Sequence, residues 1–217
     1  MKLDIPEILK ALAKKRPVFH SEADFQHSLA WQIHERHPGL HPRLEYPLER
    51  SVRKACDMAL FQRGKMVMAV ELKYFCRNLV YENKGEIFTL KSAPADTGRY
   101  GTLKDMKRME KFIKEIKETE NRTARVTVIT LTNDPELWKG PKTNRTDVEF
   151  DIQEGKIVSG ILKWAQHTSI KTKRTHPRIE IFGEYTMKWR DYSHVDGSNG
   201  KFRYLHIPIQ HPGVSLE

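Results

Sequence analysis

Residues 67–75 read VMAVELKYF, an apolar run that carries a glutamate, Glu71, and a lysine, Lys73, two positions apart. A charge inside an apolar strand is costly unless it is paired, bound to a metal or turned toward a cavity. Side chains alternate between the two faces of a strand, so Glu71 and Lys73 share one face with Val67 and Ala69. The chemistry available to this pair depends on what else reaches that face.

A preceding apolar segment carries a second carboxylate, Asp57. Directly paired residues of neighbouring strands lie on the same face, so the hairpin loop decides whether Asp57 joins Glu71. A loop of odd length, with Gly64 where a positive φ is needed, keeps the two together, whereas a two-residue loop separates them. We expect the odd loop, over residues 63–65. The patch that then holds Asp57, Glu71 and Lys73 leaves room for an ion and its waters, because the neighbouring side chains are small: Ala55, Ala59 and Ala69.

A third carboxylate, Glu22, precedes both strands. It repeats at helical spacing with Gln26, Leu29 and Ile33, which predicts that it lies on the inward stripe of a helix. An acid in the first turn also interacts favourably with the helix dipole. Glu22 could therefore reach the face of the sheet; the alternative is a first-turn glutamate in water. Gln26 is a lesser candidate on the same stripe.

The elements that would position these residues follow from local patterns. Proline, glycine and capping residues mark the ends of two helices, and β-branched or alternating apolar runs mark the strands. Strands at both ends with a strand, helix and strand between them predict a mixed sheet with helices on its faces. The expected helices cover residues 4–16, 21–36, 102–120 (capped by Thr102 with Asp105) and 151–166, and the expected strands cover 43–49, 54–62, 66–75, 124–131, 178–189 and 201–209, with a long polar loop over 78–101 that includes a strand at 86–90.

The order of these residues resembles a known superfamily. Asp57, thirteen residues, then Glu71-Leu72-Lys73, with Glu22 on a preceding helix, resembles the PD-(D/E)XK nucleases, which have the restriction-endonuclease-like fold. Further stretches are similar to one uncharacterised bacterial group of that superfamily: FHSEADFQHSLAWQI, AVELKY, RYGTLKDMKRME and KWRDYS…FRYL. Cys56 stands at the position of the name-giving proline.

The resemblance implies a fold and a domain organisation. The fold would be α/β, a restriction-endonuclease-like central mixed β-sheet flanked by helices, with a C-terminal β extension. The chain would form a single domain over residues 1–217, with the core at about 20–132 and a C-terminal elaboration at about 133–217.

The resemblance also implies an activity, a Mg²⁺-dependent endonuclease that hydrolyses phosphodiester bonds in DNA. Asp57 and Glu71 would bind Mg²⁺, for which Mn²⁺ can substitute, with the Leu72 carbonyl as an extra ligand. Lys73 would assist the attacking water or stabilise charge on the phosphate, and Glu22 would complete the shell directly or through water, with Gln26 behind it.

The balance of charge supports a polyanionic partner. The formal net charge is +10 and the isoelectric point is near 9.5, which points toward a polyanion; the alternative is a basic surface that serves solubility alone. DNA is the expected partner and RNA stays open; a homodimer would suit cleavage of two strands. A solvated face is the alternative for any one of the basic residues that are candidates for phosphate contacts: Lys84, Lys91, Arg99, Lys104, Lys107 and Lys111.

Other classes of protein find less support. The longest apolar run is too short to span a bilayer, no signal-peptide pattern opens the sequence, and the two cysteines have no metal spacing, so we expect a cytoplasmic protein. The ten histidines match no zinc motif and no phosphate-binding glycine loop is present. Two alternatives remain: a structural Glu71–Lys73 pair on a solvated face, and a nuclease-fold module that binds nucleic acid or a partner assembly without cutting alone.

Overall fold

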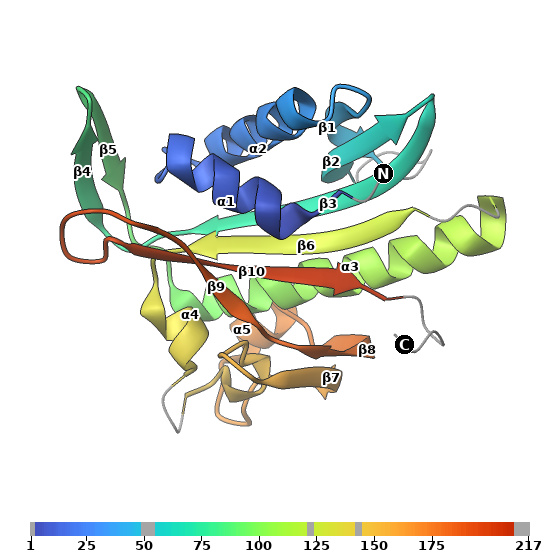
Figure 1. Ribbon diagram of the computed structural model, residues 1–217. Helices are drawn as coiled ribbons and strands as arrows, with labels where there is room; N and C mark the ends of the chain where they lie inside the picture. Colours follow the sequence, from blue (N-terminus) through green and yellow to red (C-terminus); the bar gives the residue numbers. More distant parts are fainter. Residues whose placement is uncertain (1–2, 49–54, 121–123, 142–144, 211–217) are drawn as a thin grey trace.

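The computed structural model describes residues 3–48, 55–120, 124–141 and 145–210 (Figure 1). Lys54 and Glu49, at the ends of two predicted strands, lie outside the described residues. The helices are α1 (Ile5–Lys15), α2 (Glu22–Arg36), α3 (Ala95–Glu120), α4 (Pro135–Lys139) and α5 (Ile170–Thr175), with a 3₁₀ turn, η1 (Val148–Phe150). The strands are β1 (His41–Pro47), β2 (Ala55–Gln62), β3 (Lys65–Phe75), β4 (Leu79–Asn83), β5 (Glu86–Leu90), β6 (Arg125–Thr132), β7 (Ile157–Leu162), β8 (Ile179–Thr186), β9 (Trp189–His194) and β10 (Lys201–Ile209).

Six strands form one mixed sheet in the order β1-β2-β3-β6-β10-β9. Only the central pair, β3 and β6, is parallel; every other neighbouring pair is antiparallel. The parallel pair needs a crossover, and α3 supplies most of it. The prediction of a mixed α/β sheet flanked by helices is therefore confirmed.

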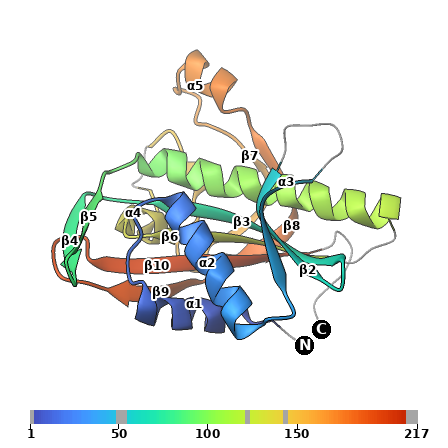
Figure 2. The same ribbon diagram turned by 90° about the horizontal axis from the view of Figure 1, so that it is seen from above.

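Helices cover both faces of the sheet. Helices α1 and α2 lie on one face and α3 lies on the other, beside the β7–β8 pair (Figures 1 and 2). Each face has its own apolar core: Leu29 of α2 belongs with Leu72 of β3, and Met106 of α3 belongs with Val128 of β6. No helix in the described part of the chain is both long and apolar enough to cross a lipid bilayer.

The first two helices begin and end where the sequence predicts. The Asp4 side chain caps α1 by accepting a hydrogen bond from the backbone N–H of Glu7, and α1 ends just before Pro17. The Ser21 hydroxyl caps α2 by accepting from the backbone N–H of Asp24 at 3.1 Å. These local signals orient α2 so that Glu22 opens its first turn.

The β2–β3 hairpin reaches the expected register by an unexpected route. The loop holds two residues, Arg63 and Gly64, both with positive φ, and not the three residues predicted. One residue of β3, Val67, is then skipped in the pairing, so a β-bulge shifts the register by one. The bulge turns Val67 toward the core that contains Leu72, on the face of the sheet away from Glu71. It also keeps Ala59 paired with Ala69. The parity that brings Asp57 to the face of Glu71 is thus set by a bulge.

Helix α3 begins at Ala95, well before the predicted start at Thr102. The predicted strand at 86–90 is β5, and β4 pairs with it in a hairpin within residues that were otherwise predicted as a polar loop. Two glycines conceal the start of α3, because glycine is a weak helix former. Both face the Phe75 ring: a Cβ atom at Gly98 would lie 3.3 Å from it, and one at Gly101 would lie 3.4 Å from it. Close packing against β3, not a turn, explains these glycines.

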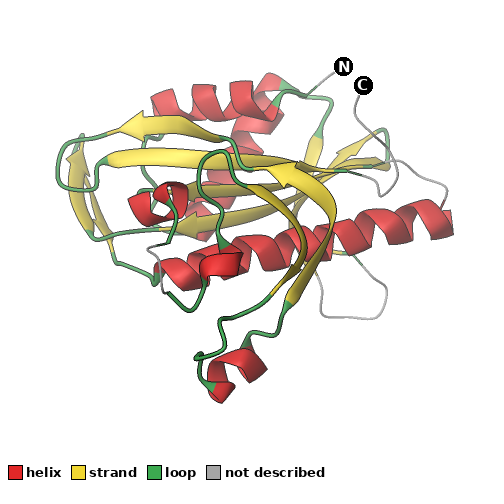
Figure 3. Ribbon diagram, turned by 90° about the horizontal axis from the view of Figure 1, so that it is seen from below, coloured by secondary structure: helices red, strands yellow, loops and turns green. Residues whose placement is uncertain are grey.

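The C-terminal part departs furthest from the prediction. Residues 151–166 form a turn and strand β7, not a helix, and β7 pairs with β8 in a separate two-stranded sheet. Strand β8 is anchored to α3, because the buried carboxylate of Glu110 accepts hydrogen bonds from the backbone of Phe182 and Gly183 and from the Tyr185 hydroxyl. Figure 3 shows these strands beside α3, with α5 projecting beyond them. The pair of strands across the 196–200 turn is β9 and β10, and not the predicted pair of 178–189 with 201–209, because most of residues 178–189 form β8, which pairs with β7.

Candidate active site

The candidate site lies where β2 and β3 separate. Their pairing ends at Met58 and Val70, whereas β3 continues beside β6 as far as Phe75. The next two backbone N–H groups on the open side of β3 therefore lack a strand partner, and two carboxylates accept from them. Asp57 Oδ2 lies 2.5 Å from the Leu72 nitrogen and Glu22 Oε2 lies 2.9 Å from the Tyr74 nitrogen. The split in the sheet thus fixes two of the predicted acids.

Lys73 lies between acids from two different helices. Its Nζ is 3.5 Å from Oε1 of Glu22 and 3.1 Å from Oδ2 of Asp105, and it donates to the Leu72 carbonyl at 2.9 Å. Burial opposes the charged form, but the carboxylates of Asp105, Glu22 and Asp57 raise the pKa of Lys73 above its ordinary value. The ammonium therefore stays charged at neutral pH, as a donor and not as a base.

Glu71 is fully buried in this site, on the face of the sheet covered by α3. One carboxylate oxygen, Oε2, accepts a hydrogen bond from the guanidinium of Arg108, and the other, Oε1, has no partner among the described residues. The alternative of a Glu71–Lys73 pair on a solvated face is therefore wrong, because Glu71 is buried and its cationic partner comes from α3. An unpartnered buried carboxylate oxygen is costly and is typical of a site that holds a further group.

Two residues of the site were missed by the sequence analysis. Asp105 and Arg108 both belong to α3, one turn apart, and Arg108 also donates to the Ala55 carbonyl at 2.9 Å. The sequence analysis assigned Asp105 to a capping box at residue 102, whereas it lies inside the helix and is buried. The available signal was the spacing of two charges on the apolar side of α3, between Leu103, Met106 and Met109.

The site carries more negative charge than positive. Among the residues that the structure describes, four carboxylates, those of Glu22, Asp57, Glu71 and Asp105, face two cations, Lys73 and Arg108.

The pKa values respond to this imbalance. Burial and the nearby carboxylates of Asp57 and Asp105 raise the pKa of Glu71 to about 9, against the effect of Arg108. Burial likewise raises the pKa values of Glu22 and Asp57. An additional cation in this site would stabilise the ionised carboxylates.

Gln26 is buried, as its place on the inward stripe predicts. Its side-chain amide donates to the backbone carbonyl of Asp57 at 2.5 Å and to Glu45 Oε1 at 2.8 Å. Gln26 therefore supports the backbone that carries Asp57. In the described residues, no hydrogen bond joins its side chain to the side-chain carboxylates of Glu22, Asp57, Glu71 or Asp105. Its role is to hold the start of β2 against α2.

The donor set suits a divalent cation in its chemistry. Carboxylate oxygens are the ligands that Mg²⁺ prefers, and Asp57, Glu71 and Asp105 supply them, with the unpartnered Oε1 of Glu71 as an open donor. The Leu72 carbonyl lies at the same edge but accepts from Lys73. In the described residues, however, no three acid, histidine or cysteine side chains are already arranged to hold an ion. The residue types fit a metal, while Arg108 and Lys73 engage the carboxylates.

One predicted phosphate contact is wrong. Arg99 is fully buried, and its guanidinium pairs with the buried carboxylate of Asp147, with Nε at 2.8 Å. It cannot reach a bound strand without breaking this ion pair.

The other five basic candidates are exposed, so nothing in their placement contradicts the prediction. Lys104, Lys107 and Lys111 lie along the outer face of α3, while Lys84 and Lys91 flank β5, in the hairpin that projects from one end of the molecule (Figure 1).

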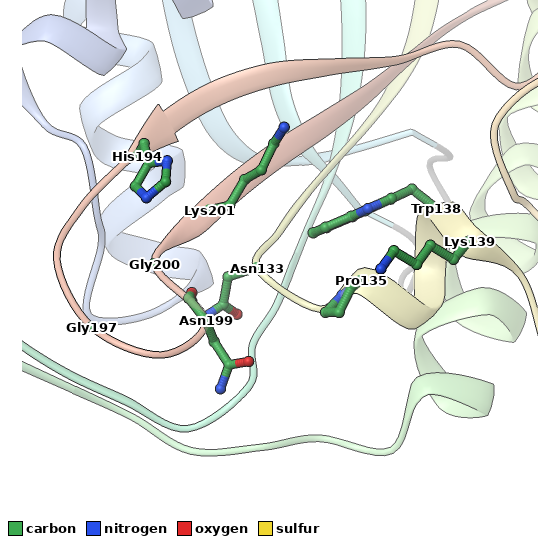
Figure 4. A pocket seen from close by; sticks show the side chains of 9 residues that line it. All are labelled: Asn133, Pro135, Trp138, Lys139, His194, Gly197, Asn199, Gly200 and Lys201. Atoms are coloured by element: carbon green, nitrogen blue, oxygen red, sulfur yellow. The ribbon is translucent and has the colours of Figure 1, made fainter.

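A separate pocket lies at the end of β6, between α4 and the β9–β10 turn, with a volume of about 460 Å³ (Figure 4). Trp138 and Lys139 of α4 border it on one side, and His194 and Lys201 border it on the other (Figure 4). None of the predicted site residues lines this pocket. The carboxylate cluster and this pocket are therefore separate sites.

Comparison of the chain with protein-family models, with curated proteins and with solved structures finds no match. Any function of this chain is therefore inferred from the residues of the site and from the resemblance of their pattern.

Proposed function

We propose that this chain is a Mg²⁺-dependent endonuclease of the PD-(D/E)XK superfamily that hydrolyses phosphodiester bonds in DNA. One observation carries the proposal: Glu22, Asp57, Glu71 and Lys73, distant in sequence, meet at the point where β2 and β3 part. The hairpin, the preceding glutamate helix and the following helix that the resemblance requires are all present.

Each residue would have a distinct task. Asp57 and Glu71 would hold the metal ion, and Asp105 adds a carboxylate within reach of Lys73. When bound, the ion would polarise a phosphoryl oxygen and lower the pKa of a bound water. Lys73, kept charged by its acidic neighbours, would orient that water and stabilise negative charge on the phosphate. Glu22 holds Lys73 in place and accepts a hydrogen bond from the Tyr74 backbone N–H on the open side of β3.

The surface around the site supports a nucleic acid as the substrate. Helix α3, which contributes Asp105 and Arg108, carries a row of exposed lysines on its outer side: Lys104, Lys107, Lys111 and Lys114. Such a row suits contacts with the phosphate backbone, which are not specific for sequence. The same row would serve a module that binds DNA without cutting it. The buried excess of carboxylates favours the enzyme, because acids facing a polyanion oppose binding unless a cation joins them.

The test is a cleavage assay on supercoiled, linear, single-stranded and branched DNA with Mg²⁺, Mn²⁺ or chelator. We expect metal-dependent cleavage of at least one form by the wild type. Asp57→Asn, which keeps an oxygen that can accept from the Leu72 nitrogen, should fold normally and lose the cleavage. Salt-dependent binding of DNA without cleavage of any form would refute the enzyme and support the binding module.

A further inference from the structure

Arg108 is held by the acids that a metal ion would need. Its guanidinium donates to Glu71 Oε2, to Asp105 Oδ1 at 3.3 Å and to the Ala55 carbonyl at 2.9 Å. It is the only cation that contacts the Glu71 carboxylate in the described part of the chain, since Lys73 is engaged elsewhere. Among the described residues, Arg108 is therefore the cationic partner of Glu71 in the metal-free protein.

The guanidinium and a divalent ion would compete for the same oxygens. Both are attracted to Glu71 and Asp105, and a carboxylate oxygen that accepts from Arg108 is screened from a second cation. The side chain of Arg108 is 30% exposed, so its head can move toward solvent without unfolding α3. Once released, it lies on the helix that carries the exposed Lys104 and Lys107, where a phosphate backbone would run under the proposed function.

We propose that Arg108 is an exchanging residue: it holds Glu71 and Asp105 in the metal-free protein, yields them to the divalent cation, and then binds the phosphate of the nucleic acid. The inference rests on the proposed nuclease function for its second half only. The planar guanidinium of arginine pairs with carboxylates and with phosphates in the same bidentate manner, so the same donor groups can serve both partners. A purely structural clamp is the competing explanation, and it predicts a different response to metal.

Two substitutions separate these explanations. Arg108→Gln removes the competing charge, whereas Arg108→Lys retains a charge but loses the fork. The matched control is Lys10→Gln, an exposed lysine of α1 on the face of the sheet opposite α3. Binding of Mn²⁺ is measured by electron paramagnetic resonance without DNA, binding of a duplex is measured by fluorescence anisotropy in Ca²⁺, and folding is monitored by circular dichroism.

We expect Arg108→Gln to bind Mn²⁺ about tenfold more tightly than the wild type, because one charged hydrogen-bonding competitor is gone. Its metal-free melting temperature should fall, since Glu71 Oε2 and the Ala55 carbonyl lose the hydrogen bonds that the guanidinium donates. Arg108→Lys should keep a Mn²⁺ affinity closer to that of the wild type. Both variants should bind the duplex more weakly than Lys10→Gln does, because the bidentate phosphate contact is lost.

Unchanged or weaker Mn²⁺ binding by Arg108→Gln would overturn the exchange and leave a structural clamp. Tighter Mn²⁺ binding with duplex affinity equal to that of the control would overturn the phosphate role. If Arg108→Gln does not fold, Arg108→Lys is used in its place. Mn²⁺ binding by Arg108→Lys that is far weaker than binding by the wild type would then refute competition between Arg108 and the metal ion. Failure of the nuclease function is distinguishable, because it appears as absent cleavage by the wild type while the Mn²⁺ comparison still decides the exchange.

Discussion

Replacing Glu71 by glutamine should make the metal-free protein more stable at neutral pH. In the folded chain, burial and the carboxylates of Asp57 and Asp105 raise the pKa of Glu71 from an ordinary value of 4.5 to about 9. The folded state therefore binds this proton more tightly than the unfolded state does. Its contribution to stability is complete below about pH 4.5 and is lost as the pH rises toward 9. A glutamine resembles the protonated carboxyl but does not ionise, so the variant does not lose this stability as the pH rises.

The size of the effect follows from the same pKa values. Between 4.5 and pH 7 the unfolded glutamate ionises while the folded one holds its proton, which destabilises the wild type by about 1.4 kcal/mol per pH unit. The advantage of Glu71→Gln should thus be near zero at pH 4.5 and on the order of 3 kcal/mol at pH 7. Most substitutions destabilise a protein, so a gain of this size at a buried position is diagnostic.

Urea denaturation of both proteins from pH 4.5 to pH 8, with chelator present, measures this difference. Glu82→Gln, on the exposed face of β4, is the matched control for the loss of a surface carboxylate. A difference that does not grow with pH, or a variant less stable than the wild type at pH 7, would refute the electrostatic reasoning about the site.

Three other outcomes follow from the described contacts. Mg²⁺ at a hundredfold excess over its Kd should stabilise the wild type by about 2.7 kcal/mol and raise its melting temperature, but should not raise that of Asp57→Asn. Equal shifts of the two melting temperatures in calorimetry would contradict the assigned ligands. Arg99→Met should cost about 3–5 kcal/mol in urea denaturation, because Asp147 loses its buried partner. Glu110→Ala should cost about 3 kcal/mol by the same measurement, since the Tyr185 hydroxyl and two backbone N–H groups lose their acceptor.

Local signals account for the parts of the site that the sequence predicted. The Ser21 cap and the inward stripe that starts at Glu22 are properties of a few consecutive residues, and so is the alternation of β3. The grouping of Asp57 with Glu71 was predicted correctly, but from the wrong loop. The Val67 bulge supplies the parity, and nothing in an alternating apolar strand indicates where a bulge falls.

The parts that the sequence missed depend on contacts between distant residues. Gly98 and Gly101 suggest a loop until Phe75 is known to pack against them, and this obscured the early turns of α3 and the place of Asp105 within it. Arg99 was predicted to belong to a basic surface because its partner, Asp147, is far along the chain. Tertiary packing overrode local propensity in both cases.

The central claim, that Lys73 and the acids around it form a metal-dependent nuclease centre, is tested most directly by one comparison. Supercoiled DNA is incubated with Mn²⁺ and either the wild type, Lys73→Ala or Lys65→Ala, the last an exposed lysine at the start of the same strand. The account predicts nicking by the wild type and by Lys65→Ala, and a rate lower by about a hundredfold or more in Lys73→Ala. Equal rates in all three proteins, or nicking that persists in chelator, would contradict it.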